Sequence, residues 1–283
     1  MSGVYGEEEQ ICLTACAAMT AQKEPVLRQR IFEARYERGY RYLDRCGDAM
    51  VILEDLLSEG TGCLWFPAEA TPTAARMICP DLDATLVFNA QNLILEQNPV
   101  GDMTFDFDQT AADSLALITG RFGLEKMRRF GWRQIKLLPT LDLEEAEELS
   151  LKYSRAGDWR HEPSVGLAAR EYEEAYRFES DDRDRGIRIA VKPFARVGVE
   201  LHVDDRLRLP PHHLPTGQRE ALFEQMRRRR KEREDPDVGL NIDIDFYRMW
   251  PTKEHSVVEF AREAKQEAEL LERDFLEFPR GKS

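Results

Sequence analysis

The sequence predicts an α+β protein whose antiparallel sheets form two adjoining halves, with helices packed on one face. Three patterns lead to this prediction. Short apolar segments are separated by only a few turn residues, which are too few for the crossover that joins parallel strands. Two longer segments carry apolar residues at spacings of three and four, as in helices that cover a sheet. In residues 105–108 and 242–245, two aspartates alternate with apolar residues, which predicts a half-buried strand in each half.

The first half is expected to begin with a strand over residues 31–36, followed by a helix. The helix is indicated by a stripe of apolar residues at alternating spacings of three and four. These residues are Leu43, Cys46, Met50, Leu53 and Leu57. Such a stripe marks the face of the helix that packs against a sheet or another helix.

Five strand-like segments follow, separated by proline, glycine and asparagine. They are residues 63–66, 74–78, 84–88, 93–96 and 103–107. Because the connections are short, we expect an antiparallel meander. A helix is then expected from Thr110 to about residue 122, and a strand over residues 129–138, which Pro139 stops.

The second half is expected to contain the same kinds of elements, strands with short connections followed by helices. An acidic run over residues 142–148 predicts the start of a helix, where carboxylates are favoured by the helix dipole. Strands are expected over residues 172–179, 187–191, 197–209 and 239–247, with a helix over residues 216–234 and a long terminal helix.

The terminal helix carries an alanine-rich apolar seam, which provides six candidate interaction residues. They are Val257, Ala261, Ala264, Ala268, Leu271 and Phe275. Their spacing resembles that of a coiled coil, but the segment is too short for a coiled coil that stands alone. We expect the seam to dock on the sheet, with contact to a second copy in a homodimer as the alternative.

These elements divide the chain into three parts. Residues 1–24 form an N-terminal extension, residues 25–140 the first α+β half, and residues 141–283 the second half with its terminal helix. Since each half contains an aspartate-alternating run before a helix, internal duplication is a hypothesis. It fails if the two runs occupy unrelated positions in the fold.

Composition restricts the cellular role. The chain has 283 residues, a net charge of −13 and a pI near 5.0, which argues against a general nucleic-acid-binding protein. No apolar run approaches the roughly 20 residues that a membrane span needs. The acidic N-terminal residues differ from the basic start of a secretory signal. We therefore expect a cytoplasmic protein that binds neither membrane nor nucleic acid.

One basic run departs from the acidic composition. It comprises Arg227, Arg228, Arg229 and Arg230. We expect a solvated helix end, where cations are favoured by the dipole, with binding to an acidic partner or a nucleic acid as the alternative. These arginines are the second set of candidate interaction residues.

Three segments together resemble a known family. Residues 31–36 form the first, Phe130-Gly131-Trp132-Arg133 resembles a central Gly-x-Arg strand, and residues 240–245 with the terminal helix form the third. On these segments, from about residue 25 to 278, the chain resembles a sporadically distributed family of bacterial proteins with no assigned function. The resemblance implies a cytoplasmic α+β protein and supplies no catalytic residues.

Most common catalytic motifs are missing from the sequence. It contains no phosphate-binding loop of the Gly-x-x-x-x-Gly-Lys-Ser/Thr type, no Gly-x-Gly-x-x-Gly, no Gly-x-Ser-x-Gly and no His-Glu-x-x-His. The remaining candidates are four carboxylates, Asp106, Asp108, Asp243 and Asp245. Carboxylate oxygens are the ligands that Mg²⁺ and Mn²⁺ prefer, so these residues are candidate metal ligands. The structural alternative is that both pairs line the wet face of a half-buried sheet.

Two functions from different classes follow. The first is a non-enzymatic binding or scaffold protein without a cofactor. It would act on a protein partner, which could be a second copy, through a sheet face or the terminal helix. The second is a metal-dependent phosphotransfer or nuclease-type enzyme that uses Mg²⁺ or Mn²⁺ at the aspartate strands. Catalysis requires at least three of these carboxylates to converge, whereas binding requires them to be separate.

Overall fold

The computed structural model describes residues 24–99, 105–153, 174–195, 237–252 and 256–277. The described elements, in chain order, are β1 (Val26–Tyr36), a 3-10 turn (Gly39–Arg41), α2 (Tyr42–Thr61), β2 (Phe66–Ala70), β3 (Ala75–Cys79), β4 (Ala84–Phe88), β5 (Asn92–Gln97), α3 (Phe107–Phe122), β6 (Met127–Pro139), α4 (Leu143–Tyr153), β7 (Glu174–Glu179), β8 (Arg185–Ala195), β9 (Val238–Met249) and α6 (Val257–Glu277).

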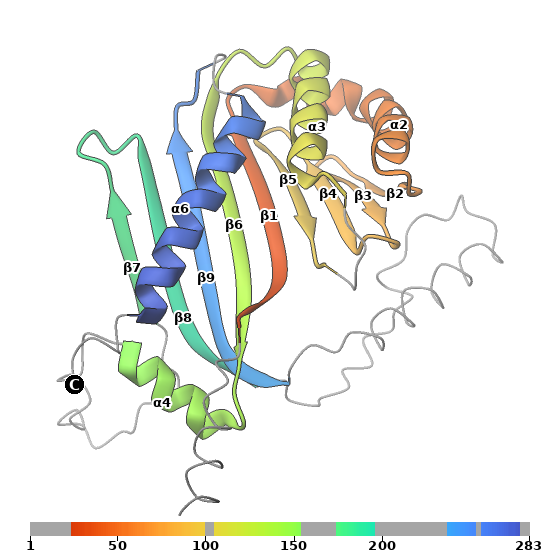
Figure 1. Cartoon of the computed structure of the whole chain (residues 1–283). Helices are drawn as coiled ribbons and strands as arrows, with labels where there is room; N and C mark the ends of the chain where they lie inside the picture. The colour runs from red at the N-terminus through yellow and green to blue at the C-terminus, as the bar shows by residue number, and fades with distance from the viewer. Residues whose placement is uncertain (1–23, 100–104, 154–173, 196–236, 253–255, 278–283) are drawn as a thin grey trace, which may run out of the picture.

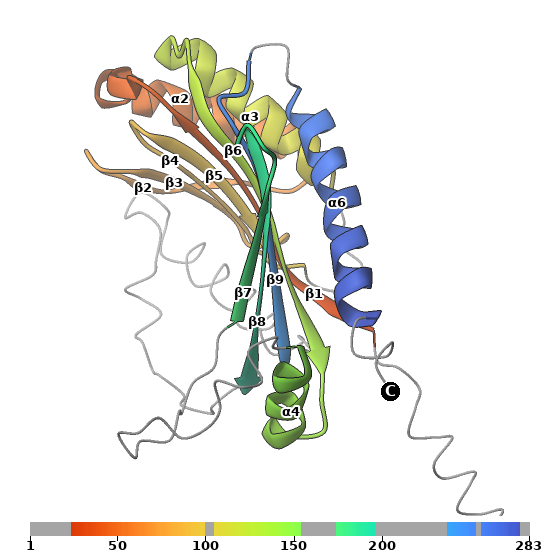
Figure 2. The same ribbon diagram turned by 90° about the vertical axis from the view of Figure 1, so that its left-hand side faces the viewer.

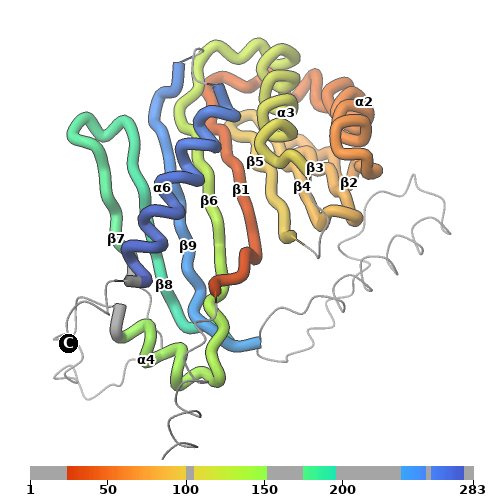
Figure 3. The backbone as a smooth tube through the Cα atoms, in the orientation of Figure 1, coloured from red at the N-terminus to blue at the C-terminus, as the bar shows by residue number. Residues whose placement is uncertain are grey.

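All nine described strands form one antiparallel sheet in the order β2-β3-β4-β5-β1-β6-β9-β8-β7. The predicted α+β class is confirmed. Strands from both expected halves meet inside this sheet, because β6 pairs with β9 from Arg129 opposite Met249 to Pro139 opposite Gly239. Figure 3 shows β6 lying between β1 and β9. The two halves therefore share one sheet.

Three helices, α2, α3 and α6, lie on one face of the sheet (Figure 1). Figure 2 shows α6 along one side of the strands. The core fills the space between the helices and the sheet. At its centre, the ring of Phe260 on α6 lies 5.6 Å from the ring of Phe130 on β6 and 5.6 Å from that of Phe246 on β9. The remaining described helix, α4, contacts β8 and β9.

The alternation of side chains along β6 separates the two faces. Phe130 and Trp132 are buried under the helices, whereas Arg129 and Arg133 point to the opposite face. Successive side chains of a strand point to opposite faces, so a strand can contribute to the core on one face and carry charges on the other only if every second residue is apolar. Residues 129–133 meet this requirement.

The seam of α6 packs on the chain's own sheet. Val257, Ala261, Ala264 and Ala268 are buried, and Leu271 and Phe275 pack partly buried against the core. This is the docked arrangement that the spacing predicted. Four of the six side chains are therefore covered within the chain itself, and Leu271 and Phe275 are partly covered.

The first aspartate run is not a strand. Asp106 is the N-cap of α3, and its carboxylate accepts a hydrogen bond of 3.0 Å from the backbone N–H of Gln109. The helix therefore starts at Phe107 rather than Thr110, because an aspartate at this position satisfies a donor of the first turn. The second run, residues 242–245, does lie in a strand, β9. Because the two runs occupy unrelated positions, the hypothesis of internal duplication fails by the criterion given above.

Some expectations fall outside the described residues. They are the N-terminal extension up to residue 23, the strand over residues 197–209, the helix over residues 216–234 and the basic run Arg227, Arg228, Arg229 and Arg230. The boundary at residue 140 falls between β6 and α4.

Replacing Phe260 by alanine should test the link between α6 and the central strands. Removing a buried phenylalanine ring costs about 3–5 kcal/mol of unfolding free energy, because transfer energy is lost and a cavity forms. Phe260→Ala should lower the free energy of urea unfolding by this amount. Leu270→Ala on the same helix is the control, since Leu270 is 46% exposed, and it should cost less than about 1 kcal/mol. Equal losses in the two variants would show that α6 does not pack on the sheet as described.

Candidate functional site

Charged side chains gather on the face of the sheet that lies opposite α2, α3 and α6. These three helices leave this face uncovered. We call it the open face, and its charged and polar residues are Glu33 and Arg35 of β1, Arg129 and Arg133 of β6, Asp243, Asp245 and Tyr247 of β9, Arg188 of β8, and Arg177 and Glu179 of β7. The strand register brings these residues together from segments that are far apart in the sequence.

Two glycines make room for long side chains to lie flat on the open face. A Cβ atom on Gly131 would lie 2.8 Å from Nη1 of Arg129, and a Cβ atom on Gly186 would lie 2.5 Å from the hydroxyl oxygen of Tyr247. Gly131 and Gly186 both lie opposite Tyr247 on the two neighbouring strands. The absence of their side chains therefore allows Arg129 and Tyr247 to lie across the sheet.

Arg129 connects the two carboxylates on either side of β6. Its guanidinium donates to Glu33 on β1, and Nη2 donates to both carboxylate oxygens of Asp245 on β9, at 3.1 and 2.8 Å. The side chains of Arg129 and Glu33 are only 16% and 15% exposed, so this bridge is largely removed from water. Burial raises the pKa of Asp245, and the positive charges of Arg129 and Arg133 partly oppose that rise.

Asp243 holds Arg133 in a two-point contact. Nε and Nη2 of Arg133 donate to the two oxygens of Asp243, each at 2.6 Å. Nη1 of Arg188 on β8 lies 3.6 Å from the same carboxylate. Two guanidinium groups therefore converge on one carboxylate, and Asp245 lies opposite both arginines in the strand register.

Tyr247 lies between arginines and a carboxylate. Its hydroxyl donates to Glu179 at 2.6 Å, and the guanidinium carbons of Arg129 and Arg177 lie 5.3 and 5.9 Å from its ring centre. Burial, followed by the hydrogen bond to Glu179, raises the pKa of Tyr247. The phenol is therefore a neutral hydrogen-bond donor that positions Glu179.

The open face contains a hollow with a volume of about 780 Å³, within the range of small-molecule sites. Its lining residues are Ile31, Glu33, Arg35, Ile94, Glu96, Arg129, Arg133, Arg177, Glu179, Arg183, Arg188, Asp245, Tyr247 and Met249. Six of these residues are arginines and four are acidic, whereas the whole chain carries a net charge of −13. The hollow is thus a local region of positive charge on an acidic protein.

The four candidate metal ligands do not form one site. Asp106 caps α3, Asp108 pairs with Lys265 of α6, and Asp243 and Asp245 are bound by Arg133 and Arg129 on the open face. Among the described residues, no group of three or more His, Cys, Asp or Glu side chains is placed to hold a metal ion. Within the part of the chain that the structure describes, the convergence that the metal-dependent alternative requires is therefore not found, because α3 starts early and carries its two aspartates to the helix side.

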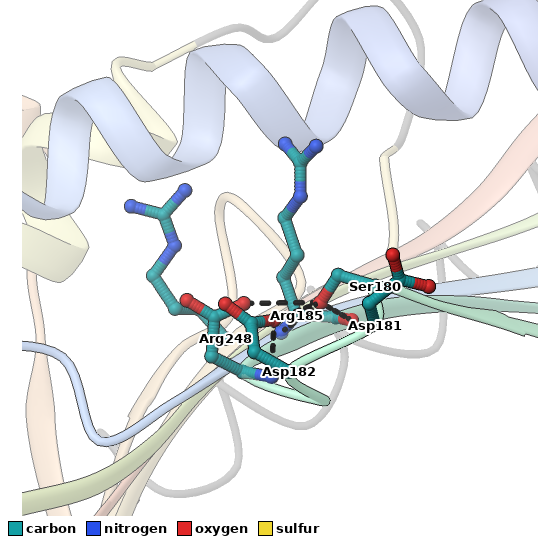
Figure 4. Close-up of a pocket in the computed structure, with 6 residues that line it drawn as sticks. Ser180, Asp181, Asp182, Arg185 and Arg248 are labelled. Atoms are coloured by element: carbon teal, nitrogen blue, oxygen red, sulfur yellow. Dashed lines mark hydrogen bonds between the residues drawn. The ribbon is translucent and has the colours of Figure 1, made fainter.

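A second, smaller hollow of about 450 Å³ lies at the turn between β7 and β8 (Figure 4). Arg185 and Arg248 both bind Glu263 of α6, at 3.2 and 2.7 Å. The hydroxyl of Ser180 lies 2.7 Å from a carboxylate oxygen of Asp182, which lowers the pKa of that carboxyl. The polar groups of this hollow therefore bind to one another, and the ion pairs of Arg185 and Arg248 with Glu263 connect this region to α6.

Sequence analysis missed most of the residues that line the larger hollow. It identified Asp243 and Asp245, but it did not connect them with Arg129, Arg188 or Tyr247. One signal was present: Arg129 and Arg133 are four residues apart and Asp243 and Asp245 are two apart, so each pair shares one face of its strand. Pairing these two strands in antiparallel register would have placed their charges opposite each other.

Comparison with known proteins adds no assignment, because no family model and no curated protein matches the chain. The resemblance to a bacterial family of unassigned function therefore remains a prediction. None of the helices in the described part of the chain combines the length and the apolar character that crossing a bilayer requires.

Replacing Arg129 by methionine should leave Glu33 and Asp245 without the cation that pairs with both. Removing one partner of a buried ion pair costs about 3–5 kcal/mol, and the partial exposure here reduces the expected loss to about 2 kcal/mol. The pKa of Asp245, already raised by burial, should rise further without Arg129. Because a protonated Asp245 needs no cation, the loss of unfolding free energy should shrink as the pH falls from about 7 to about 4.

Urea unfolding of Arg129→Met at several pH values checks this expectation. Arg35→Met is the matched control, because Arg35 is 55% exposed and also contacts Glu33. It should cost less than about 1 kcal/mol and show little change with pH. A loss for Arg129→Met that is constant over the pH range would contradict the role assigned to Arg129.

Proposed function

We propose that this protein is a non-enzymatic binding protein that holds an anionic ligand in the hollow of its open face. The observation that carries the proposal is the excess of arginines over carboxylates in that hollow, on a chain whose overall charge is strongly negative. On an acidic protein, carboxylates would be expected to outnumber arginines in an ordinary group of surface ion pairs.

The relative exposure of the charged groups supports this proposal. The side chain of Arg133 is 42% exposed and that of its partner Asp243 16%. Arg177 and Glu179 show the same order, at 63% and 32%. In these two pairs the carboxylate is the more buried partner and holds an arginine whose guanidinium reaches the solvent, whereas Arg129, at 16%, is less exposed than Asp245, at 25%. A binding site whose side chains are fixed in advance loses less entropy when its ligand binds.

The chemistry of the arginines indicates what kind of ligand would fit. A guanidinium group presents paired N–H donors that match the oxygens of a carboxylate or a phosphate. Arg133 and Arg188 converge near Asp243, which places two guanidinium groups side by side on the open face. Ile31, Ile94 and Met249 add apolar walls to the same hollow. We infer a ligand with one or more oxyanion groups on a partly apolar body.

The metal-dependent enzyme hypothesis receives no such support. Its four aspartates are each occupied by a cation or a helix N-terminus in the described residues. A cytoplasmic location remains a prediction from composition.

Titration of the full chain with anions tests the proposal. The panel consists of inorganic phosphate, pyrophosphate, ATP and citrate, and the measurement is the melting temperature followed by calorimetry. A ligand that binds only the folded state raises stability with its concentration, by about 2.7 kcal/mol at one hundred times Kd. At least one anion should raise the melting temperature, and the double variant Arg133→Gln/Arg188→Gln should weaken its binding at least about tenfold.

Arg76→Gln is the matched control for this titration. Arg76 is an exposed arginine on β3, which is separated from the hollow strand β5 by β4. Binding by this variant should equal that of the unmodified chain. If no anion of the panel stabilises the protein, or if all three chains respond equally, the hollow is not the binding site.

A further inference from the structure

The two outermost strands of the sheet differ in how their edges are protected. At one end, β2 contains Pro67, which lacks a backbone N–H, and its pairing with β3 shifts register between Pro67 and Glu69. Proline and bulges are devices that prevent a strand edge from pairing with another chain. At the other end, β7 contains no proline and pairs with β8 without a register shift.

The outer edge of β7 presents backbone groups for pairing. The N–H of Ser180 donates to the carbonyl of Arg185 on β8. Because hydrogen bonding alternates along an antiparallel strand, the N–H and C=O groups of Phe178 also point to β8, and those of Arg177 and Glu179 point outwards. No described segment pairs with this outer edge.

The side chains of β7 are complementary to a second copy of the same strand. In an antiparallel pair with a two-fold axis through Phe178, Arg177 of each copy lies opposite Glu179 of the other. This register places the outward-pointing backbone groups of Arg177 and Glu179 opposite each other, so both residues exchange hydrogen bonds. It also keeps both charged residues on the open face and both phenylalanines on the helix face.

We propose that two copies of the chain associate through β7 in this register and form one continuous sheet. We choose a second copy as the partner because the charge pattern of β7 is self-complementary in this register. In a register shifted so that Arg177 lay opposite Arg177 of the other copy, two like charges would face each other. Phe178 supports the choice, since it is 50% exposed and would be covered by its counterpart across the axis.

This association also bears on the larger hollow. Arg177 and Glu179 line the hollow and stand on the strand that would pair. The second copy of β7 would therefore lie directly beside the hollow and join the two open faces across the axis.

Complementary charge reversals test the proposal. Sedimentation velocity of the full chain at concentrations from about 5 to 200 μM should show a dimer. Arg177→Glu places acids opposite acids, and Glu179→Arg places arginines opposite arginines, so each variant alone should weaken dimerisation at least about tenfold. An equimolar mixture of the two variants should form heterodimers, because every pair across the axis is then of opposite sign.

A matched charge reversal and a cross-link complete the test. Arg45→Glu makes the same change on α2, where Arg45 is 55% exposed, and should dimerise like the unmodified chain. Phe178→Cys should form a disulfide-linked dimer on mild oxidation, since the two Cβ atoms at the axis would lie about 4.5–5.5 Å apart, whereas Ala175→Cys should not. A monomer throughout the concentration range, or a mixture of the two reversed variants that stays monomeric, would overturn the proposal.

Discussion

Both faces of the molecule depend on the alternation of side chains in the central strands β1, β6 and β9. In each of these strands one set of alternate residues contributes a large apolar side chain under the helices, as with Phe32, Phe130 and Phe246. The other set lies on the open face and includes the charged residues that form its ion pairs. A shift of one residue in either pairing would exchange the two sets, burying arginines under α6 and exposing phenylalanines. The register is therefore fixed by the hydrophobic core, and the arrangement of charges follows from it.

The ion pairs of the open face take their geometry from this fixed register. Arg129 can bridge Glu33 and Asp245 only because β1 and β9 hold these carboxylates on either side of it. The absence of a side chain at Gly131 gives the guanidinium room to lie there. The carboxylates in turn keep the arginines at set positions on a surface exposed to water. We regard this as the physical basis of the proposed anion site: the sheet positions the acids, and the acids position the cations.

How far the sequence predicted this structure depends on whether a feature is local. The residues of β4, the buried residues Met50, Leu53 and Leu57 of α2 and the alanine seam of α6 were recognised because their periodicity is contained within one segment. Leu43, which was placed on the same stripe, is 64% exposed, so that part of the prediction is wrong. The start of α3 was misplaced, since an aspartate after an apolar residue fits both a strand and a helix cap. Asp243 and Asp245 were selected from their strand, but their partners were not. Arg129 lies 116 residues before Asp245, and only the strand order, which periodicity does not give, brings the two together.

The position of β9 has a consequence for how the chain folds. β9 comes after every other described strand in the sequence, yet it lies inside the sheet between β6 and β8. During synthesis, β1 to β6 can pair as soon as they leave the ribosome, but one edge of β6 has no neighbour until residues 238–249 have been made. Long-range pairings of this kind slow folding, and the uncovered edge of β6 is a site for aggregation in the meantime. A chain that ends before residue 238 would leave this edge of β6 without its neighbour, so a segment in the last fifth of the sequence covers a strand made in the first half.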